Sequence, residues 1–230
     1  MQNNVPHIVY IFLLKRELGH GQGQHFLRSL DKILGVQLIA SIYAAKNNND
    51  LSAILTWCAT RLIVAKAVTL PQEWEADNRS FDYAVAAGYN PGAGAAGFVR
   101  VKARYGEPGR NILGELLSPS DHPTNSQRIA NFAAKMTEYG RGNVTVDRGA
   151  ILIRGKPWFT PVGGNGQYAE ERAYLIAGEL AKVYHDPATP PAATAENGAV
   201  IMGGRIVVTP LAGEPAAAEL AGAVNAINGV

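Results

Sequence analysis

The chain has 230 residues, 47% of them hydrophobic, which is enough to fill the core of one large domain, or of one medium domain with a small module. Its 21 lysines and arginines nearly balance 19 aspartates and glutamates, and the basic residues are dispersed rather than interleaved with aromatic ones, so a dedicated nucleic-acid surface is excluded. The single cysteine, Cys58, excludes an internal disulfide.

The amino-terminal part is predicted to be a helix from Val9 to Ala45. Its apolar residues recur at spacings of three and four, as one face of a helix requires. That face consists of Leu27, Leu30, Ile33, Leu34, Leu38 and Ile42. The apolar run from Ile8 to Leu14 is too short to span a bilayer, and no cleavage site of small residues follows it. We therefore expect no signal peptide and no transmembrane segment in this chain.

This helix carries the segment Arg16-Glu17-Leu18-Gly19-His20, which differs at one position from the zinc-binding pattern H-E-x-x-H. In that pattern two imidazoles one helical turn apart hold a zinc ion, and the glutamate polarises the metal-bound water. Arg16 stands where the first histidine would be. A guanidinium stays protonated and offers only hydrogen-bond donors, so it cannot ligate zinc. Taken alone, Glu17 and His20 also fit an ordinary pair of polar residues on a helix surface.

A second helix is predicted from Leu51 to Leu70, with Asp50 as its amino-terminal cap. The segment is nearly apolar, but Arg61 and Lys66 would each cost about 2.5–3.5 kcal/mol near the centre of a bilayer. We therefore expect a buried hairpin that packs on the first helix. Contact with a membrane surface is the minority alternative.

A third helix is predicted to begin at Pro71, because a proline in the first helical turn loses no hydrogen bond. Glu73 and Asp77 are four residues apart and share one face of this helix. Gly88 is expected to end it as a left-handed cap. From these residues alone, a solvated acidic face remains the alternative interpretation.

Four short motifs follow one another between residues 10 and 135. They are the degenerate zinc segment, the E-x-x-x-D spacing of Glu73 and Asp77, the turn Ala87-Gly88-Tyr89-Asn90-Pro91, and His122-Pro123 followed by Arg128. Together they resemble the gluzincin family of zinc endopeptidases that includes HtpX, the CAAX prenyl proteases and BepA. The resemblance implies that residues 1–140 form a mainly helical, zincin-like peptidase domain.

The resemblance assigns a zinc site to this domain. His20 matches the second zinc-binding histidine, Glu73 matches the glutamate that is the third ligand, and Glu17 matches the general base. Because Arg16 replaces the first histidine, the resemblance implies weakened zinc binding and weakened catalysis. An ion pair between Arg16 and Glu73 would occupy the space of the metal.

Three further residues match family positions around the zinc site. Asp77 matches the acid that orients a ligand imidazole. His122 matches a histidine near the metal that regulates zinc or stabilises the oxyanion, and Arg128 matches the arginine that braces this segment. The family also places a glycine-rich edge strand and a supporting helix before the zinc helix, where this chain has only Met1 to Lys15. We therefore expect an amino-terminally incomplete domain that lacks the strand on which substrate aligns.

Residues 141–230 are predicted to form a small α/β module. Its expected elements are two β pairs, each followed by a helix, with a loose Pro/Ala connection between the two halves. These are strands Val144–Val146 and Ile151–Ile153 turning at 147–149, helix Ala169–His185, connection Pro187–Ala195, strands Ala199–Met202 and Arg205–Thr209 turning at 203–204, and a helix from about Pro215. The segment 163–166 matches no phosphate-binding loop and is expected to be a flexible loop.

The expected fold class is therefore α+β. The expected function is that of a zinc-dependent metalloendopeptidase-like protein, impaired by Arg16, with a peptide or unfolded protein as substrate. The first alternative is an inactive pseudopeptidase that binds peptides or proteins without cleaving them. In the second, the zinc fold serves only as a packing scaffold and the carboxy-terminal module carries the function.

Overall fold

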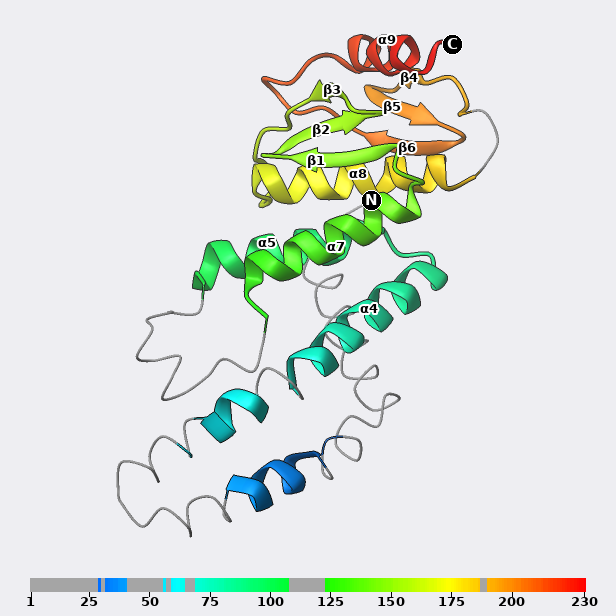
Figure 1. Cartoon of the computed structure of the whole chain (residues 1–230). Coiled ribbons are helices and arrows are strands. Elements are labelled where there is room, and N and C mark those ends of the chain that lie inside the picture. Colours follow the sequence, from blue (N-terminus) through cyan, green and yellow to red (C-terminus); the bar gives the residue numbers. More distant parts are fainter. Residues whose placement is uncertain are drawn as a thin grey trace. The chain divides into compact units, whose positions relative to one another are not determined.

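The computed structural model describes residues 29, 32–40, 56, 59–64, 69–107, 123–186 and 190–230 (Figure 1). The chain divides into two compact units. We call residues 81–106 and 125–230 the C-terminal unit, and the described residues among 13–80 and 107–124 the N-terminal unit.

The expected mixture of helices and antiparallel strands is confirmed. Helix α4 spans Leu70–Ala86 and begins as predicted around Pro71, and Gly88 follows it with φ of +81°. The C-terminal unit contains α5 (Ala93–Tyr105), α7 (Asn125–Tyr139), β1 (Val144–Asp147), β2 (Ala150–Ile153), β3 (Lys156–Phe159), α8 (Ala169–His185), β4 (Thr194–Glu196), β5 (Ala199–Met202), β6 (Arg205–Val208) and α9 (Ala217–Asn228).

The segment after residue 140 consists of two copies of one βββα unit. Each copy forms its own three-stranded antiparallel sheet, in the orders β1-β2-β3 and β4-β5-β6. The copies share a register irregularity at the same place, between Ile151 and Leu152 in the first and between Val200 and Ile201 in the second. Their first hairpins turn at residues with positive φ, Arg148-Gly149 and Asn197-Gly198, as two-residue hairpin turns of this hand require.

The two copies exchange packing partners. Helix α8 packs against β1 and β2 of its own copy but also against β6, and α9 packs against β4 and β5 but also against β3. The strands lie between α8 and α9 in three layers (Figure 1). At one crossing, Nε1 of Trp158 in β3 donates a hydrogen bond to the carbonyl oxygen of Leu220 in α9, at 3.0 Å. Each copy therefore completes the core of the other.

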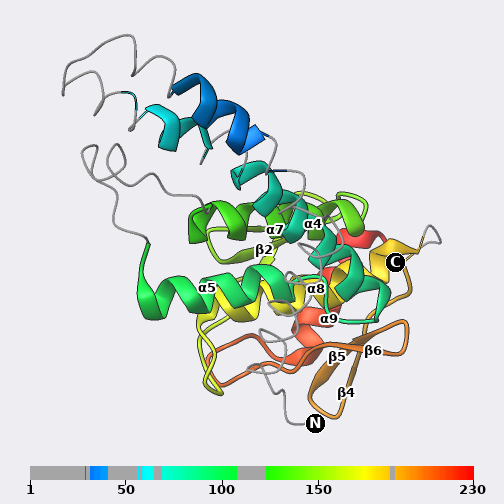
Figure 2. The same cartoon turned by 90° about the horizontal axis from the view of Figure 1, so that it is seen from below.

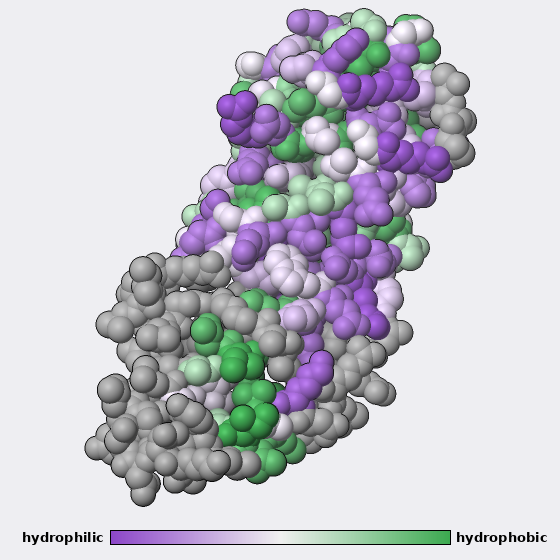
Figure 3. Space-filling view, viewed as in Figure 1, coloured by the Kyte–Doolittle hydropathy of each residue, from purple (hydrophilic) through white to green (hydrophobic). Residues whose placement is uncertain are grey.

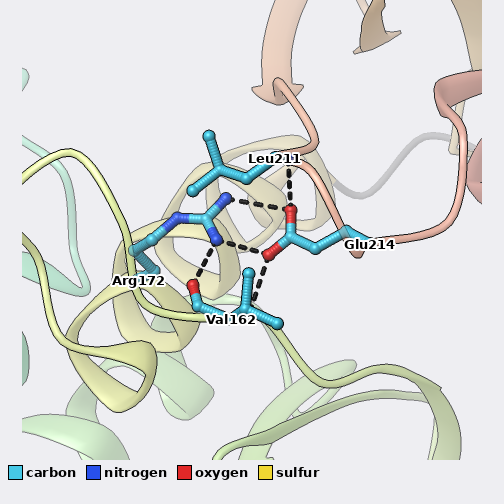
Figure 4. A network of polar contacts seen from close by, with 4 residues as sticks. All are labelled: Val162, Arg172, Leu211 and Glu214. Atoms are coloured by element: carbon cyan, nitrogen blue, oxygen red, sulfur yellow. Dashed lines mark hydrogen bonds and ion pairs between the residues drawn. The ribbon is translucent and has the colours of Figure 1, made fainter.

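A buried ion pair joins the two copies (Figure 4). Arg172 on α8 and Glu214, which precedes α9, have side chains only 7% and 0% exposed. Glu214 also accepts hydrogen bonds from the backbone amides of Val162 and Leu211, at 2.8 Å and 2.7 Å. Burial by itself would raise the pKa of Glu214. The hydrogen bonds from Arg172, Leu211 and Val162 outweigh that effect, so its pKa lies below the ordinary value.

Helices α5 and α7 lie beside α8 and share its core (Figure 2). Asn90, in the turn before α5, connects this turn to α8. Its Nδ2 donates hydrogen bonds to the carbonyl oxygen of Leu175 and to the side chain of Glu179, both at 2.8 Å. The approach is close because Gly178 has no side chain. A Cβ at that position would lie 1.8 Å from Oδ1 of Asn90.

Several elements were not predicted. Strand β3 contains Pro157, which is tolerated because β3 lies at the edge of its sheet. Strand β4 occupies the end of the segment that was expected to be a loose connection. Helices α5 and α7 were not predicted from the sequence. Residues 163–166 form a loop that closes through a bridge between Gly164 and Gln167.

The N-terminal unit contains described helical residues at 32–40 and 59–63, within the two predicted helices. Their apolar residues gather on the face drawn in Figure 3. The exposed large apolar side chains among the described residues of this unit are Leu34, Leu38, Ile39 and Ile63. The other residues of the predicted helices Val9–Ala45 and Leu51–Leu70 lie largely outside the described part of the chain. Among described residues, no helix is both long and apolar enough to cross a membrane.

Replacing Gly178 by alanine is expected to destabilise the fold, because the new methyl group must displace Asn90 or the adjoining backbone. Overpacking of this kind costs about 1–3 kcal/mol, which urea denaturation would measure. Gly222→Ala in α9 is the matched control, since a Cβ there meets nothing within 4 Å. It should stabilise the protein by about 0.5–1 kcal/mol. Equal effects of the two substitutions would contradict the close approach of α5 and α8.

Replacing Glu214 by glutamine should lower the free energy of unfolding at pH 7 by about 3 kcal/mol, because Arg172 then stays buried without its counter-charge. Since the pKa of Glu214 is lowered in the fold, its charge stabilises the protein above the ordinary glutamate pKa of 4.5. That stabilisation is lost as the pH falls through the folded value, so the difference between Glu214→Gln and wild type should shrink below about pH 4.5. Glu219→Gln, at an exposed position of α9, is the control. A constant difference down to pH 3 would argue against the ion pair.

Candidate functional site

The predicted zinc site is described only in part. Glu73 and Asp77 lie on α4, in the N-terminal unit, and Arg128 lies on α7, in the C-terminal unit. Arg16, Glu17, His20 and His122 lie outside the residues that the structure describes. The roles assigned to those four residues, and the expected ion pair between Arg16 and Glu73, therefore stay predictions.

Glu73 and Asp77 both point into the protein. Their exposed fractions are 4% and 0%, and Ala76 and Ser80 on the same face are 0% and 1% exposed. This three- and four-residue spacing is that of one helix face. The alternative of a solvated acidic face at these two positions is therefore wrong.

The acidic residues of α4 are divided between its two faces. Glu75 forms an ion pair with Arg79 one turn later, at 2.7 Å, and both side chains are about one-third exposed. Such a pair contributes about 0–1 kcal/mol. In contrast, an isolated carboxylate with the burial of Asp77 would be strongly unfavourable unless a positive or hydrogen-bonding group compensated it. Both Glu73 and Asp77 have interaction partners.

A carboxylate in this position has the chemistry of a metal ligand or of the acid that orients one. Oxygen atoms of glutamate are ordinary zinc ligands, and an aspartate commonly fixes a ligand imidazole. Glu73 and Asp77 therefore fit the roles expected of them. Among the described residues alone, no group of three histidine, cysteine, aspartate or glutamate side chains converges on one point.

Arg128 is buried, with 8% of the residue exposed. Its guanidinium carbon lies 4.9 Å from the centre of the Phe98 ring on α5, and Phe98 stacks against Phe132 at 5.7 Å. Arg128 thus packs α7 against α5 through a cation–π contact.

The structure also contains a polar pocket that the sequence did not indicate. It has a volume of about 490 Å³ and lies in the C-terminal unit, where α4, α7 and α8 end. We call it the helix-end pocket. The lining residues used below are Tyr89, Tyr139, Arg141, Lys182, His185 and Arg205. They come from four separate stretches of chain, so no sequence motif joins them.

In comparisons with family models, curated proteins and solved structures, none matches this chain. The resemblance to gluzincins therefore rests on the four motifs.

Replacing Asp77 by asparagine keeps the size of the side chain but removes its charge. Because Asp77 is fully buried and has a partner, we expect a loss of at least about 1 kcal/mol in the free energy of unfolding. Asp82→Asn is the control on the same helix: its side chain is 64% exposed and pairs with Lys135 at 3.4 Å. That change should stay within about 0.5 kcal/mol. An Asp77 variant as stable as the Asp82 variant would show that the interactions of the buried carboxylate contribute no net stability.

Proposed function

We propose that this chain is a zinc metalloendopeptidase-like protein whose metal site is degenerate at Arg16. The observation that carries the proposal is the burial of Glu73 and Asp77 on one face of α4. A buried carboxylate pair with the E-x-x-x-D spacing is what a zinc ligand and its orienting acid would need, whereas surface acids need no such burial. The order of the four motifs along the chain supports the same function.

In this proposal His20 and Glu73 hold the metal, and Asp77 orients the ligand imidazole. Bound zinc would supply a Lewis acid and lower the pKa of a bound water. Glu17 takes a proton from the attacking water as the water oxygen bonds to the peptide carbonyl carbon. His122 stabilises the resulting oxyanion. Glu17 then delivers the proton to the leaving nitrogen as the C–N bond breaks.

Arg16 favours a second candidate, a pseudopeptidase that binds peptides without cleaving them. Catalytic zinc sites use three protein ligands and one water, and Arg16 leaves only two matched ligands. Its guanidinium would serve instead as the positive partner of Glu73. Elemental analysis of the purified protein separates the two candidates. Near one zinc per chain after dialysis favours the peptidase and requires a substitute ligand. Absence of zinc favours the pseudopeptidase.

The substitution Arg16→His tests the proposed site directly. It should restore two imidazoles one helical turn apart, with Glu73 as the third ligand. Zinc would then stabilise the folded state by about 2.7 kcal/mol at a hundredfold excess over its dissociation constant. We therefore expect a melting temperature that rises with zinc and falls with chelator.

The control is the double variant Arg16→His/Glu73→Gln, which removes one ligand and should lose the response to zinc. Wild type should respond weakly or not at all. If neither zinc nor chelator changes the melting temperature of Arg16→His, then His20 and Glu73 do not share a metal site, and the proposed family is wrong.

A further inference from the structure

The helix-end pocket contains more positive charge than its internal contacts use. Arg141, Lys182 and Arg205 line it, and Asp186 is the one acidic residue in its described lining. Lys182 is engaged, because its Nζ donates to the carbonyl oxygen of Gly88 and to Glu179, both at 3.2 Å. The positive charges of Arg141 and Arg205 are not balanced by these contacts.

Both guanidinium groups keep unused donors. Arg141 donates from Nε to the carbonyl oxygen of His185, at 2.8 Å, and its two terminal nitrogens make no hydrogen bond within the described chain. Arg205, the first residue of β6, makes no hydrogen bond or ion pair with any residue that the structure describes. Two guanidiniums that face one pocket can hold an oxyanion through several N–H···O bonds at once.

Part of the pocket wall is aromatic and held in place from two helices. The rings of Tyr139, at the end of α7, and His185, at the end of α8, stack with their centres 3.9 Å apart. Nδ1 of His185 lies 2.9 Å from the carbonyl oxygen of Tyr139. Since a carbonyl oxygen only accepts, Nδ1 carries the proton. Together with the bond from Arg141 to His185, these contacts make the wall rigid before any ligand arrives.

The ordinary explanation of basic residues at helix ends is that they neutralise the last carbonyl groups. This accounts for Lys182 and for Nε of Arg141, whose acceptors are such carbonyls. It does not account for Arg205, which lies on a strand, or for the terminal nitrogens of Arg141. Burial raises the pKa of Tyr139 while the charge of Arg205 acts to lower it, so Arg205 is close enough to the phenol to influence it.

We propose that the helix-end pocket binds a phosphorylated small molecule, with its phosphate between Arg141 and Arg205 and its organic part against the Tyr139–His185 stack. The volume of about 490 Å³ is within the range of small-molecule sites. Two unused guanidinium charges match a dianionic phosphate better than a singly charged carboxylate. The proposal does not depend on zinc or on the peptidase function.

Calorimetric titration of the full-length chain tests this proposal, with phenyl phosphate as the probe and inorganic phosphate and benzoate as comparison ligands. We expect saturable binding of phenyl phosphate at one site. It should bind more tightly than inorganic phosphate, because of the ring, and more tightly than benzoate, because of the second charge. Arg205→Gln should weaken phenyl phosphate binding by about tenfold, the effect of losing one charge-assisted hydrogen bond.

Lys156→Gln is the matched control, because Lys156 takes the place of Arg205 in the first βββα copy: it pairs with Ile153 as Arg205 pairs with Met202. Both positions are exposed, so both variants should keep the wild-type melting temperature. Binding to Lys156→Gln should change by less than about twofold, as for a screened surface charge. Equal weakening in the two variants, benzoate binding as tightly as phenyl phosphate, or no saturable binding would each overturn the proposal.

Discussion

The C-terminal unit depends on the packing of the third strand of each βββα copy against the helix of the other copy. Strand β3 packs against α9 and β6 against α8, so neither copy encloses its own apolar residues. Trp158 and Phe159 of β3 are 8% exposed, and Val207 and Val208 of β6 are 3% and 4% exposed. An isolated copy would present these side chains to water, at about 25 cal/mol for each Å² of apolar surface. The Arg172–Glu214 pair lies at the same junction and needs both copies for its burial. We therefore expect the two copies to unfold together.

The same core fixes one of the four sequence motifs, the turn Ala87–Pro91. Asn90 belongs to the Tyr-Asn-Pro turn, and its amide bonds to Leu175 and Glu179 on α8. A bidentate ion pair between Arg100 on α5 and the fully buried side chain of Glu171, at 2.8 Å and 2.9 Å, adds a second attachment. The turn at Asn90 and helices α5 and α7 are thus held by the module that follows them. The division of the chain at residue 140, drawn from composition, stays a prediction, although packing continues across that position.

Local signals allowed most of the module to be predicted. Helix α8 has the expected bounds, and a capping box involving Tyr168 and Glu171 begins it. The missed elements depend on contacts between distant residues. Helix α5 is rich in glycine, and a Cβ at Gly94 would lie 2.4 Å from the Phe132 ring on α7. Gly94, a poor helix former by itself, is required by this packing. The buried positions of Glu73 and Asp77 could be predicted from the sequence, because the residues of that face recur at helical spacing. The helix-end pocket could not be predicted, because four separate stretches of chain form it.

The duplication has a consequence for how this protein can change. Two copies of one βββα unit, in which the third strand of each packs on the helix of the other, have the reciprocal contacts of a symmetric homodimer. In such a dimer any substitution is made on both sides at once. In a single chain each half can diverge alone. The first copy has Pro157 where the second has Ile206, and Lys156 where the second has Arg205. Helix α8 could thus acquire α5 and α7 as neighbours, and β6 could place an arginine at a pocket, without any matching change in the other half. Because the two copies stand in one chain, each side of this fold can change without the other.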